Sequence, residues 1–338
     1  MSKVLVTGAA GFIGYHTCER LVADGHDVVG LDNLNTYYDL RYKQARLDRL
    51  ARLDKFRFVR MELSDRPGVA ELFRAERFDR VINLAAYAGV RHSIEHPEDY
   101  VDTNLVGFHN VLEGCRRTGV GHLVYASSSS VYGANRRYPS STEHATAHPI
   151  SFYAATKLAN EGMAHSYADM FGVPCTGLRF FTVYGPWGRP DMALFLFTKA
   201  ILSGEPIKVF NHGKMRRDFT YVDDIIEGVV RLMDQVAEPD PQWRGEAPTG
   251  NTSRAPWRLY NIGNNGQVGL MDMISALEQE LGKEAIKDYL PMQPGDVEAS
   301  WANVDPLVRD AGYQPGTPIQ EGIRRFVAWY REFHGEER

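Results

Sequence analysis

The sequence predicts an α/β protein, with a doubly wound parallel sheet joined to a smaller α/β domain. Three observations support this fold class. A glycine-rich turn separates the first predicted strand from the first predicted helix. Strand-like and helical segments then alternate along residues 1–181, which is typical of a parallel sheet covered on both faces. A chain of 338 residues, 43% hydrophobic and 24% charged, is long enough for a large domain and a smaller one.

The first strand and its turn carry the pattern of a phosphate-binding loop. Residues 3–7 form a short apolar run, which predicts a buried parallel strand. Gly8, Gly11 and Gly14 follow, before a helical stretch at residues 15–23. Glycine permits the tight turn and a close approach of the backbone to a pyrophosphate, and the helix N-terminus offers free N–H groups to the anion. The segment therefore predicts a Rossmann-type dinucleotide site.

An acidic residue ends the second predicted strand. Residues 27–32 are largely apolar up to Asp32, which stands 18 residues after Gly14. A carboxylate at this place accepts hydrogen bonds from a ribose and repels a 2′-phosphate. The sequence therefore favours NAD over NADP.

The remaining elements extend this sheet and then depart from its rhythm. Further strands are expected at residues 56–60, 79–84, 121–126 and 173–181, and a strand at 257–262 is expected to rejoin the sheet. Helices are expected at about 97–118, 151–171, 192–202, 223–234, 270–281 and 319–333. Turn-rich residues 184–191, 238–256 and 291–296 predict loops. We assign residues 1–181 to the dinucleotide-binding domain, with 217–262 returning to it, and residues 182–216 and 263–338 to the substrate-binding domain.

A tyrosine and a lysine four residues apart suggest proton-transfer chemistry. On a helix, Tyr153 and Lys157 project side by side, and the ammonium favours the phenolate. A hydroxyl of the preceding serine run could share a proton with the same substrate oxygen. The pair alone is a common amphipathic pattern, and the predicted dinucleotide site is the reason to interpret it as a proton-transfer pair.

Composition excludes several other classes. The net charge of -5 argues against a general nucleic-acid binder. Three widely spaced cysteines predict buried or free thiols in a reducing compartment, with neither a disulfide framework nor a zinc site, so no metal is expected. No apolar run is long enough to span a membrane, and the first strand leaves no room for a signal peptide. We expect a cytoplasmic enzyme.

These motifs resemble a known family. The glycine turn, Asp32, the serine run, the Tyr153–Lys157 pair and the stretch at residues 217–224 resemble the extended short-chain dehydrogenase/reductases, and among these the nucleotide-sugar epimerases. Residues 180–193 (FFTVYGPWGRPDMA), 213–218 and 292–297 narrow the resemblance to epimerases of UDP-linked uronates. The similarity runs from residue 3 to residue 333.

The resemblance implies reversible C4 epimerisation of UDP-glucuronate to UDP-galacturonate. Tightly bound NAD takes a hydride from C4 while Tyr153 removes the hydroxyl proton, and the 4-keto sugar turns before the hydride returns. Lys157 holds the nicotinamide ribose and lowers the Tyr153 pKa, and Ser128 hydrogen-bonds the C4 oxygen. The resemblance further implies cofactor contacts from Gly8, Gly11, Phe12, Ile13, Gly14, Asp32, Asn33, Glu62, Leu63, Leu84, Ala85, Ala86 and Asn104.

The substrate contacts follow from the same resemblance. Ser127, Ser129 and Thr182 are candidates for the uronate carboxylate, although a structural hydroxyl is about as probable for each. Arg217 is expected to bind the UDP phosphates, because guanidinium suits a bidentate contact. Further nucleotide contacts are expected from Arg189, Lys199, Val209 and Gln293.

Two alternatives within the enzymes stay open. UDP-glucose 4-epimerases resembling this chain usually have Asn where Thr182 stands. UDP-glucuronate decarboxylases resembling it carry Glu at the position of Ser130, and Ser has no carboxylate for that work. A non-catalytic dinucleotide-binding regulator is a third possibility. The resemblance also implies a homodimer, with helices near Asn104 and Met163 forming a four-helix bundle.

Overall fold

A seven-stranded parallel sheet forms the centre of the molecule. The computed structural model describes residues 1–293 and 296–335. The strands lie in the order β11-β6-β5-β4-β1-β2-β3, and every pairing is parallel. Their bounds are β1 Lys3–Thr7, β2 Asp27–Asp32, β3 Phe56–Arg60, β4 Arg80–Asn83, β5 His122–Ser128, β6 Cys175–Phe180 and β11 Trp257–Ile262. The predicted doubly wound sheet is confirmed, and the strand at residues 257–262 rejoins it beside β6.

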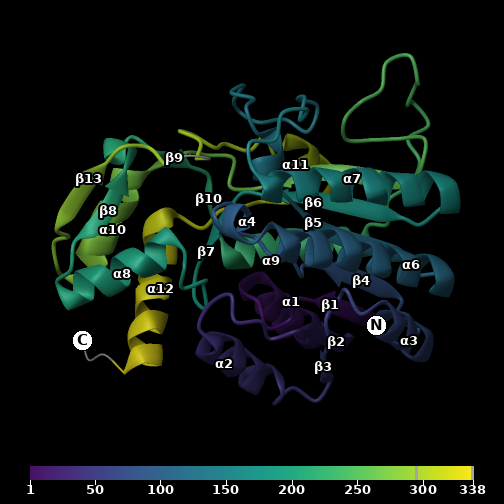
Figure 1. The fold of residues 1–338 in the computed structure, drawn as a ribbon, viewed down its shortest axis with the longest axis horizontal. Coiled ribbons are helices and arrows are strands. Elements are labelled where there is room, and N and C mark those ends of the chain that lie inside the picture. Colours follow the sequence, from purple (N-terminus) through teal and green to yellow (C-terminus); the bar gives the residue numbers. More distant parts are fainter. Residues whose placement is uncertain (294–295, 336–338) are drawn as a thin grey trace.

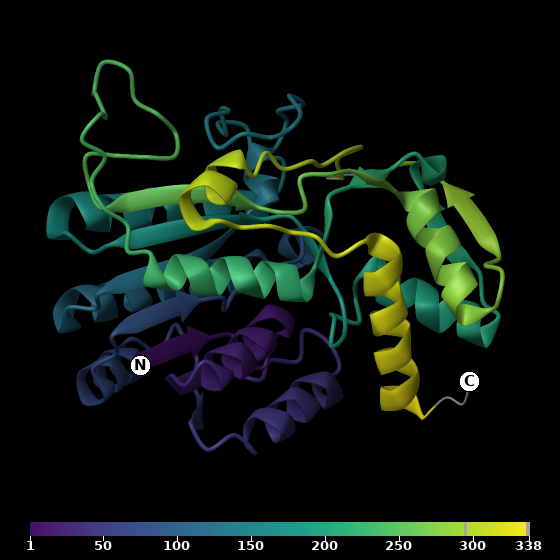
Figure 2. The ribbon, with the colours of Figure 1, turned by 180° about the vertical axis from the view of Figure 1, so that it is seen from behind.

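Helices cover both faces of the sheet. Alternate residues of each strand point to opposite sides, so that Val4 and Val6 pack in one hydrophobic cluster and Leu5 in another. Helices α3 (Arg66–Glu76), α6 (Phe108–Thr118) and α7 (Phe152–Phe171) cover the face seen in Figure 1. Helices α1 (Phe12–Ala23), α2 (Leu40–Leu50) and α9 (Val222–Asp234) lie on the other face, as Figure 2 shows.

The helical segment expected at residues 97–118 is divided into three parts. They are the short helix α5 (Pro97–Tyr100), the π-helix η1 (Val101–Gly107) and α6, and a further short helix, α4 (His92–Glu95), precedes them. The π-helical turn places Asn104 and Gly107 inside the molecule. Such turns are often found at functional sites.

A smaller part lies beyond the C-terminal ends of the strands, at the left of Figure 1. It contains α8 (Ala193–Ser203), β8 (Ile207–Phe210), α10 (Leu270–Leu281), β13 (Lys287–Leu290) and α12 (Ile319–His334). Strands β8 and β13 pair in parallel. Two short strand pairs lie between the two parts. Strand β7 (Thr182–Tyr184) pairs with β10 (Phe219–Tyr221), and β9 (Arg216–Arg217) pairs with β12 (Val268–Gly269). Helix α11 (Asp305–Ala311) contacts β11. The two short 3₁₀ helices are η2 (Ser129–Tyr132) and η3 (Asn211–Gly213).

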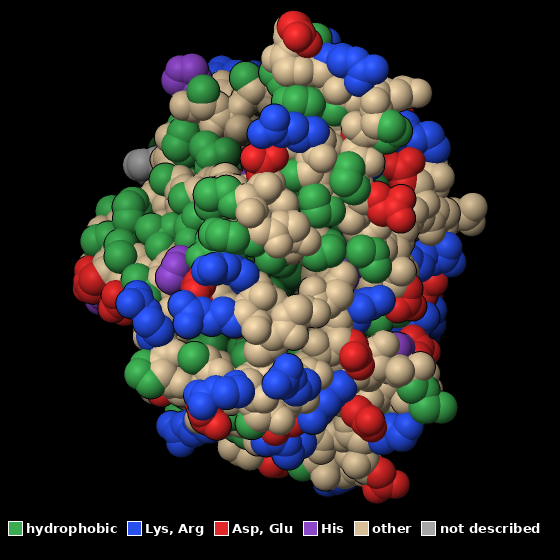
Figure 3. Space-filling view, turned by 90° about the vertical axis from the view of Figure 1, so that its right-hand side faces the viewer, with side chains coloured by type: hydrophobic (Ala, Val, Ile, Leu, Met, Phe, Trp, Pro, Cys, Tyr) green, Lys and Arg blue, Asp and Glu red, His purple; other side chains and the backbone are tan. Residues whose placement is uncertain are grey.

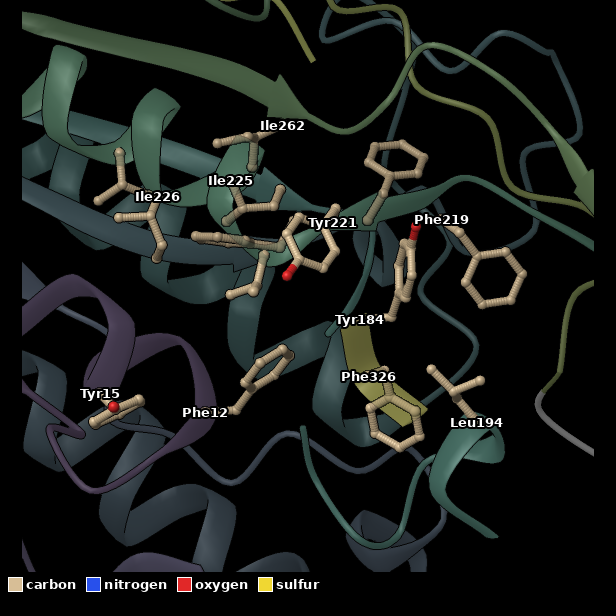
Figure 4. Close-up of a cluster of buried hydrophobic side chains, with 14 of the residues drawn as sticks. Phe12, Tyr15, Tyr184, Leu194, Phe219, Tyr221, Ile225, Ile226, Ile262 and Phe326 are labelled. Atoms are coloured by element: carbon tan, nitrogen blue, oxygen red, sulfur yellow. The ribbon is translucent and has the colours of Figure 1, made fainter. Parts of the chain in front are cut away.

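One continuous hydrophobic cluster joins the smaller part to the sheet. In Figure 4, Phe12 of α1, Tyr184 of β7, Tyr221 of β10 and Phe326 of α12 lie in this cluster. The fully buried Ile262 extends this cluster to the edge strand β11. The walls of the space between the parts are therefore held by shared packing.

The three cysteines are buried and free, as the spacing predicts. Among residues 1–293 and 296–335, no group of three or more His, Cys, Asp or Glu side chains could hold a metal ion. Within the same residues, none of the helices combines the length and hydrophobicity that crossing a membrane requires.

Candidate active site

The glycine turn forms a cradle that side chains would fill. Gly8 adopts φ +72°, a left-handed conformation that favours glycine. A Cβ on Gly8 would lie 2.8 Å from the amide nitrogen of Ala85, which follows β4. A Cβ on Gly14 would overlap the carbonyl oxygen of Gly8. Helix α1 begins at Phe12, so its free N–H groups face this cradle, where a pyrophosphate fits.

Asp32 closes the cradle from the end of β2. Its carboxylate accepts hydrogen bonds from the amides of Ala10 at 3.1 Å and Leu34 at 2.9 Å. The ammonium of Lys43 lies 3.8 Å from the same carboxylate, and both side chains are buried. The geometry suits a ribose whose hydroxyls donate to Asp32.

A cavity runs from the glycine cradle along the carboxyl ends of β1, β2 and β4. Nearly all the predicted cofactor residues line it: Gly8, Gly11, Phe12, Ile13, Gly14, Asp32, Asn33, Glu62, Leu63, Leu84, Ala85, Ala86, Tyr153 and Lys157. This lining fits a dinucleotide. Sequence reasoning did not identify several other lining residues, among them Asn35, Tyr37, Lys43 and Thr103. Their contribution depends on loop conformation, which no short motif encodes.

Asn104 lies behind the cavity wall. Its side chain accepts from the amide of Tyr87 at 3.0 Å and donates to the Tyr87 carbonyl at 3.1 Å. It also donates to Thr156 of α7, and its own carbonyl accepts from Asn160. Asn104 thus fastens the loop after β4 to helix α7, and the neighbouring Thr103 lines the cavity.

Tyr153 and Lys157 line this cavity, and Ser128 interacts with Tyr153 beside it. A side-chain hydrogen bond joins Tyr153 to Ser128 and lowers the Tyr153 pKa, but burial has the larger effect and raises it overall. The Lys157 ammonium donates to the carbonyl of Ala126 at 2.8 Å. Burial lowers the pKa of Lys157 to about 8, while the charge of Glu161 raises it. A phenol, a hydroxyl and an ammonium at one place can move a proton to and from a bound hydroxyl group.

The three candidate carboxylate ligands differ in their surroundings. Ser127 is buried, and its hydroxyl donates to Glu161 at 2.5 Å. Ser129 opens the 3₁₀ turn η2 and is half-buried. Thr182 begins β7 and is half-buried, with its amide bonded to the carbonyl of Asp218. Of these three candidates, Ser129 and Thr182 have hydroxyl groups that make no hydrogen bond within the described part of the chain, whereas the Ser127 hydroxyl is bonded to Glu161.

The expected nucleotide-binding residues are spread between the two parts. Arg217 is mostly buried, 4.0 Å from Asp296, and burial lowers its pKa. Arg189 lines the cofactor cavity, where it pairs with Asp191 at 2.5 Å and contacts Tyr37.

The other three expected nucleotide contacts lie in the smaller part. Gln293 has a buried side-chain oxygen without a partner among the described residues, so it can accept a ligand hydrogen bond. Val209 is fully buried in β8, and its partner in the β8–β13 register is Tyr289. Lys199 is exposed on α8. Their roles stay predictions.

Comparison with known proteins adds independent information. Residues 4–244 match the model of the NAD dependent epimerase/dehydratase family. The chain is 52% identical to Protein CapI of Staphylococcus aureus, over 98% of this chain and 99% of that protein. It is 45% identical to a protein of Rhizobium meliloti named probable UDP-glucuronate 4-epimerase, over 97% of this chain and 96% of that one.

A solved structure is similar throughout. The UDP-glucuronic acid 4-epimerase from Bacillus cereus, in complex with UDP-glucuronic acid and NAD, has a TM-score of 0.87 and 32% identity, covering 98% of this chain and 99% of that chain. The match extends over both the sheet and the smaller part. With its glycine cradle and its Tyr153–Lys157 pair, the chain belongs to the NAD dependent epimerase/dehydratase family.

Proposed function

We propose that this protein interconverts UDP-glucuronate and UDP-galacturonate by epimerisation at C4, with bound NAD. The observation that carries the proposal is the position of Tyr153, bonded to Ser128 and one helical turn before the buried Lys157, in the cavity that fits a dinucleotide. The relatives that match nearly the full length and bear the name of this activity support the choice of substrate.

The side chains divide the proton chemistry between them. Tyr153 accepts the proton of the 4-hydroxyl and returns it at the end of the cycle, so no net proton is consumed. Ser128 hydrogen-bonds the same oxygen, and Lys157 stabilises the phenolate by its charge. NAD, when bound, supplies the hydride acceptor and donor.

The serine run favours epimerisation over elimination or decarboxylation. Ser129 and Ser130 stand where a general acid and base would be needed, and neither side chain holds a carboxylate. A 4-keto uronate is a β-keto acid and loses CO₂ readily. Ser129 and Thr182 are the hydroxyls free to hold its carboxylate, and this contact would slow that loss by fixing the carboxylate orientation.

The nucleotide end of the substrate points toward the smaller part. Arg217 is the candidate for the diphosphate, since its weak 4.0 Å contact with Asp296 can be exchanged for a bidentate phosphate contact. The Gln293 side-chain oxygen, which has no partner among residues 1–293 and 296–335, suits a donor on the nucleotide. The substrate domain then comprises residues 182–216 and 263–338, as the sequence suggests.

The same proposal includes a homodimer. Exposed hydrophobic residues occur on the helices in front of the sheet: Ile94 on α4, Val101 on η1, and Phe152, Met170 and Phe171 on α7. Figure 3 shows hydrophobic side chains gathered at the left, on the side that faces the viewer in Figure 1. Such a face is typical of an interface between identical subunits. Light scattering with Val101→Glu checks it, with a monomer expected for the variant.

The decisive experiment uses the purified protein without added NAD. UDP-glucuronate is added, and the sugar products are followed by NMR. A mixture of UDP-glucuronate and UDP-galacturonate is expected, and would also show that NAD is retained during purification. UDP-pentose and CO₂ would replace the proposal with a decarboxylase. No change, even after addition of NAD, would reject it and direct the search to neutral nucleotide sugars.

A further inference from the structure

A buried ion pair lies directly behind the serine run. Glu161 of α7 accepts two hydrogen bonds from Arg179 of β6, from Nε at 2.9 Å and from Nη2 at 2.8 Å. Their side chains are only 7% and 3% exposed. A buried pair of this kind adds little stability compared with hydrophobic residues of similar volume. Stability alone is therefore a weak reason for placing these charges beside the site.

The ion pair determines how Ser127 can interact with a ligand. The Ser127 hydroxyl donates its single proton to Glu161 at 2.5 Å. Toward the cavity, which Ser127 lines, it therefore offers only oxygen lone pairs. A carboxylate has no proton to donate, so this orientation is unfavourable for the uronate carboxylate. A hydroxyl or amide N–H of a ligand is the complementary partner.

The pair also acts on the proton-transfer residues. Tyr153, Lys157 and Glu161 follow one another at intervals of four residues along one face of α7. The Glu161 carboxylate supports the charged form of Lys157 against the effect of burial.

Other titratable groups surround this line of residues on every side. They are Tyr100 of α5, whose ring packs against Tyr153, Tyr125 on β5, Tyr132 in η2, Arg179 on β6 and Arg189 in the loop after β7. Among these groups and Tyr153, Lys157 and Glu161, Glu161 is the only carboxylate.

We propose that Glu161, clamped by Arg179, is a positioning residue for the epimerase reaction. It turns the Ser127 hydroxyl so that its lone pairs face the cavity, and it keeps the Lys157 ammonium charged beside Tyr153. The inference rests on the proposed function, because it concerns the same Tyr153–Lys157 pair.

Glu161→Gln tests the electrostatic part, since it keeps the shape and removes the charge. We expect retained NAD, a KM for UDP-glucuronate within about threefold, and a kcat lowered about tenfold or more at pH 8. The pH above which kcat declines should move down by about one unit, because Lys157 loses its proton more easily. A purely structural role would lower the melting temperature without moving this pH.

The unpaired guanidinium left by this change could prevent folding, so a double variant provides a second route. Glu161→Gln combined with Arg179→Met removes both charges, and its melting temperature should exceed that of Glu161→Gln. The shift in the pH profile should persist, since the negative charge is still missing. Asp169→Asn is the matched control, because it removes an exposed ion pair with Arg254 from the same helix. Its kcat and pH profile should equal those of the wild type.

Ser127→Ala tests the orientation of the hydroxyl. If the lone pairs face the cavity, Ser127→Ala removes no contact to the carboxylate. The KM for UDP-glucuronate and the inhibition constant of UDP-glucose, which lacks the carboxylate, should then change by the same factor. A rise of about tenfold or more for UDP-glucuronate alone, as expected for loss of a hydrogen bond to a charged group, would overturn this assignment. If the wild type is active and the pH dependence of kcat is unshifted in both Glu161→Gln and the double variant, the role of Glu161 would be overturned. An inactive wild type would instead reject the proposed function itself.

Discussion

The ammonium of Lys157 lies 2.8 Å from the backbone carbonyl oxygen of Ala126. This hydrogen bond fixes a side chain of α7 at the end of β5, beside the serine run. Because the site is buried, the charged form of Lys157 is easily lost, and its pKa falls to about 8.

Activity should therefore decline at alkaline pH. The Lys157 ammonium is present below pH about 8 and is lost as the pH rises through this value. The phenolate of Tyr153 then loses the charge of Lys157, and the charge of Arg189 remains as its stabilising cation. We expect kcat/KM to fall above about pH 8, measured by coupled or NMR rates at constant ionic strength. A profile that is flat to pH 10 would contradict this role for Lys157.

Tyr153→Phe should retain NAD and lose nearly all turnover. The hydroxyl is the proposed base, and removal of such a group costs about 10²–10⁴-fold. Tyr167→Phe is a suitable control, since it removes a hydroxyl from the same helix that is bonded to Glu113 at 2.9 Å. Initial rates and the nucleotide released on denaturation measure the two properties. Near-normal activity of Tyr153→Phe would remove Tyr153 as the base.

Gly14→Ala should abolish retention of the cofactor. The added methyl group would overlap the carbonyl oxygen of Gly8, so the turn must move. Gly245→Ala provides the comparison, because that glycine lies in an exposed loop whose nearest atom is 3.8 Å from an added Cβ. Bound nucleotide after repeated buffer exchange measures the effect. Equal NAD content in both variants would show that the turn tolerates a side chain.

The protein should lose stability as the pH falls below the range of histidine. His122 is fully buried, bonded to the carbonyl of Met233 at 3.1 Å and to Thr176 at 2.9 Å. Burial lowers its pKa from 6.5 to about 4. The free energy of unfolding therefore keeps the full contribution of neutral His122 above pH 6.5 and loses it as the pH falls toward 4. At pH 5 this loss amounts to about 2 kcal/mol. Urea unfolding from pH 7 to 5 should show a smaller decline for His122→Gln than for the wild type.

Local sequence was sufficient for the centre of the fold. The apolar runs at β1 and β2 and the glycines between them predict these elements correctly, because the strand, the turn and the helix N-terminus are adjacent in the chain.

Helices α2 and α3 were not predicted. In α2 the residues facing inward include Lys43 and Arg46, which hides the apolar face. In α3 a proline and a glycine in the first turn resemble a loop signal.

Part of the candidate site depends on contacts between distant residues. The glycine cradle, Asp32 and the Tyr153–Lys157 pair are recognisable because their spacing is short and characteristic. The pairing of Ser127 with Glu161 spans 34 residues and arises only when α7 packs beside β5 and β6. No spacing rule could have shown that the hydroxyl proton of this serine is already engaged in a hydrogen bond to Glu161.

The order of the strands has a consequence for synthesis on the ribosome. Strand β6 is complete at Phe180, but its outer neighbour β11 begins only at Trp257. A growing chain therefore holds an unpaired apolar edge while about 80 further residues are translated, which takes roughly 4–16 s at typical bacterial and eukaryotic elongation rates. Exposed strand edges are sites of aggregation. Residues 257–262 thus act as the closing strand of the nascent domain, and chains truncated before them should be insoluble when expressed.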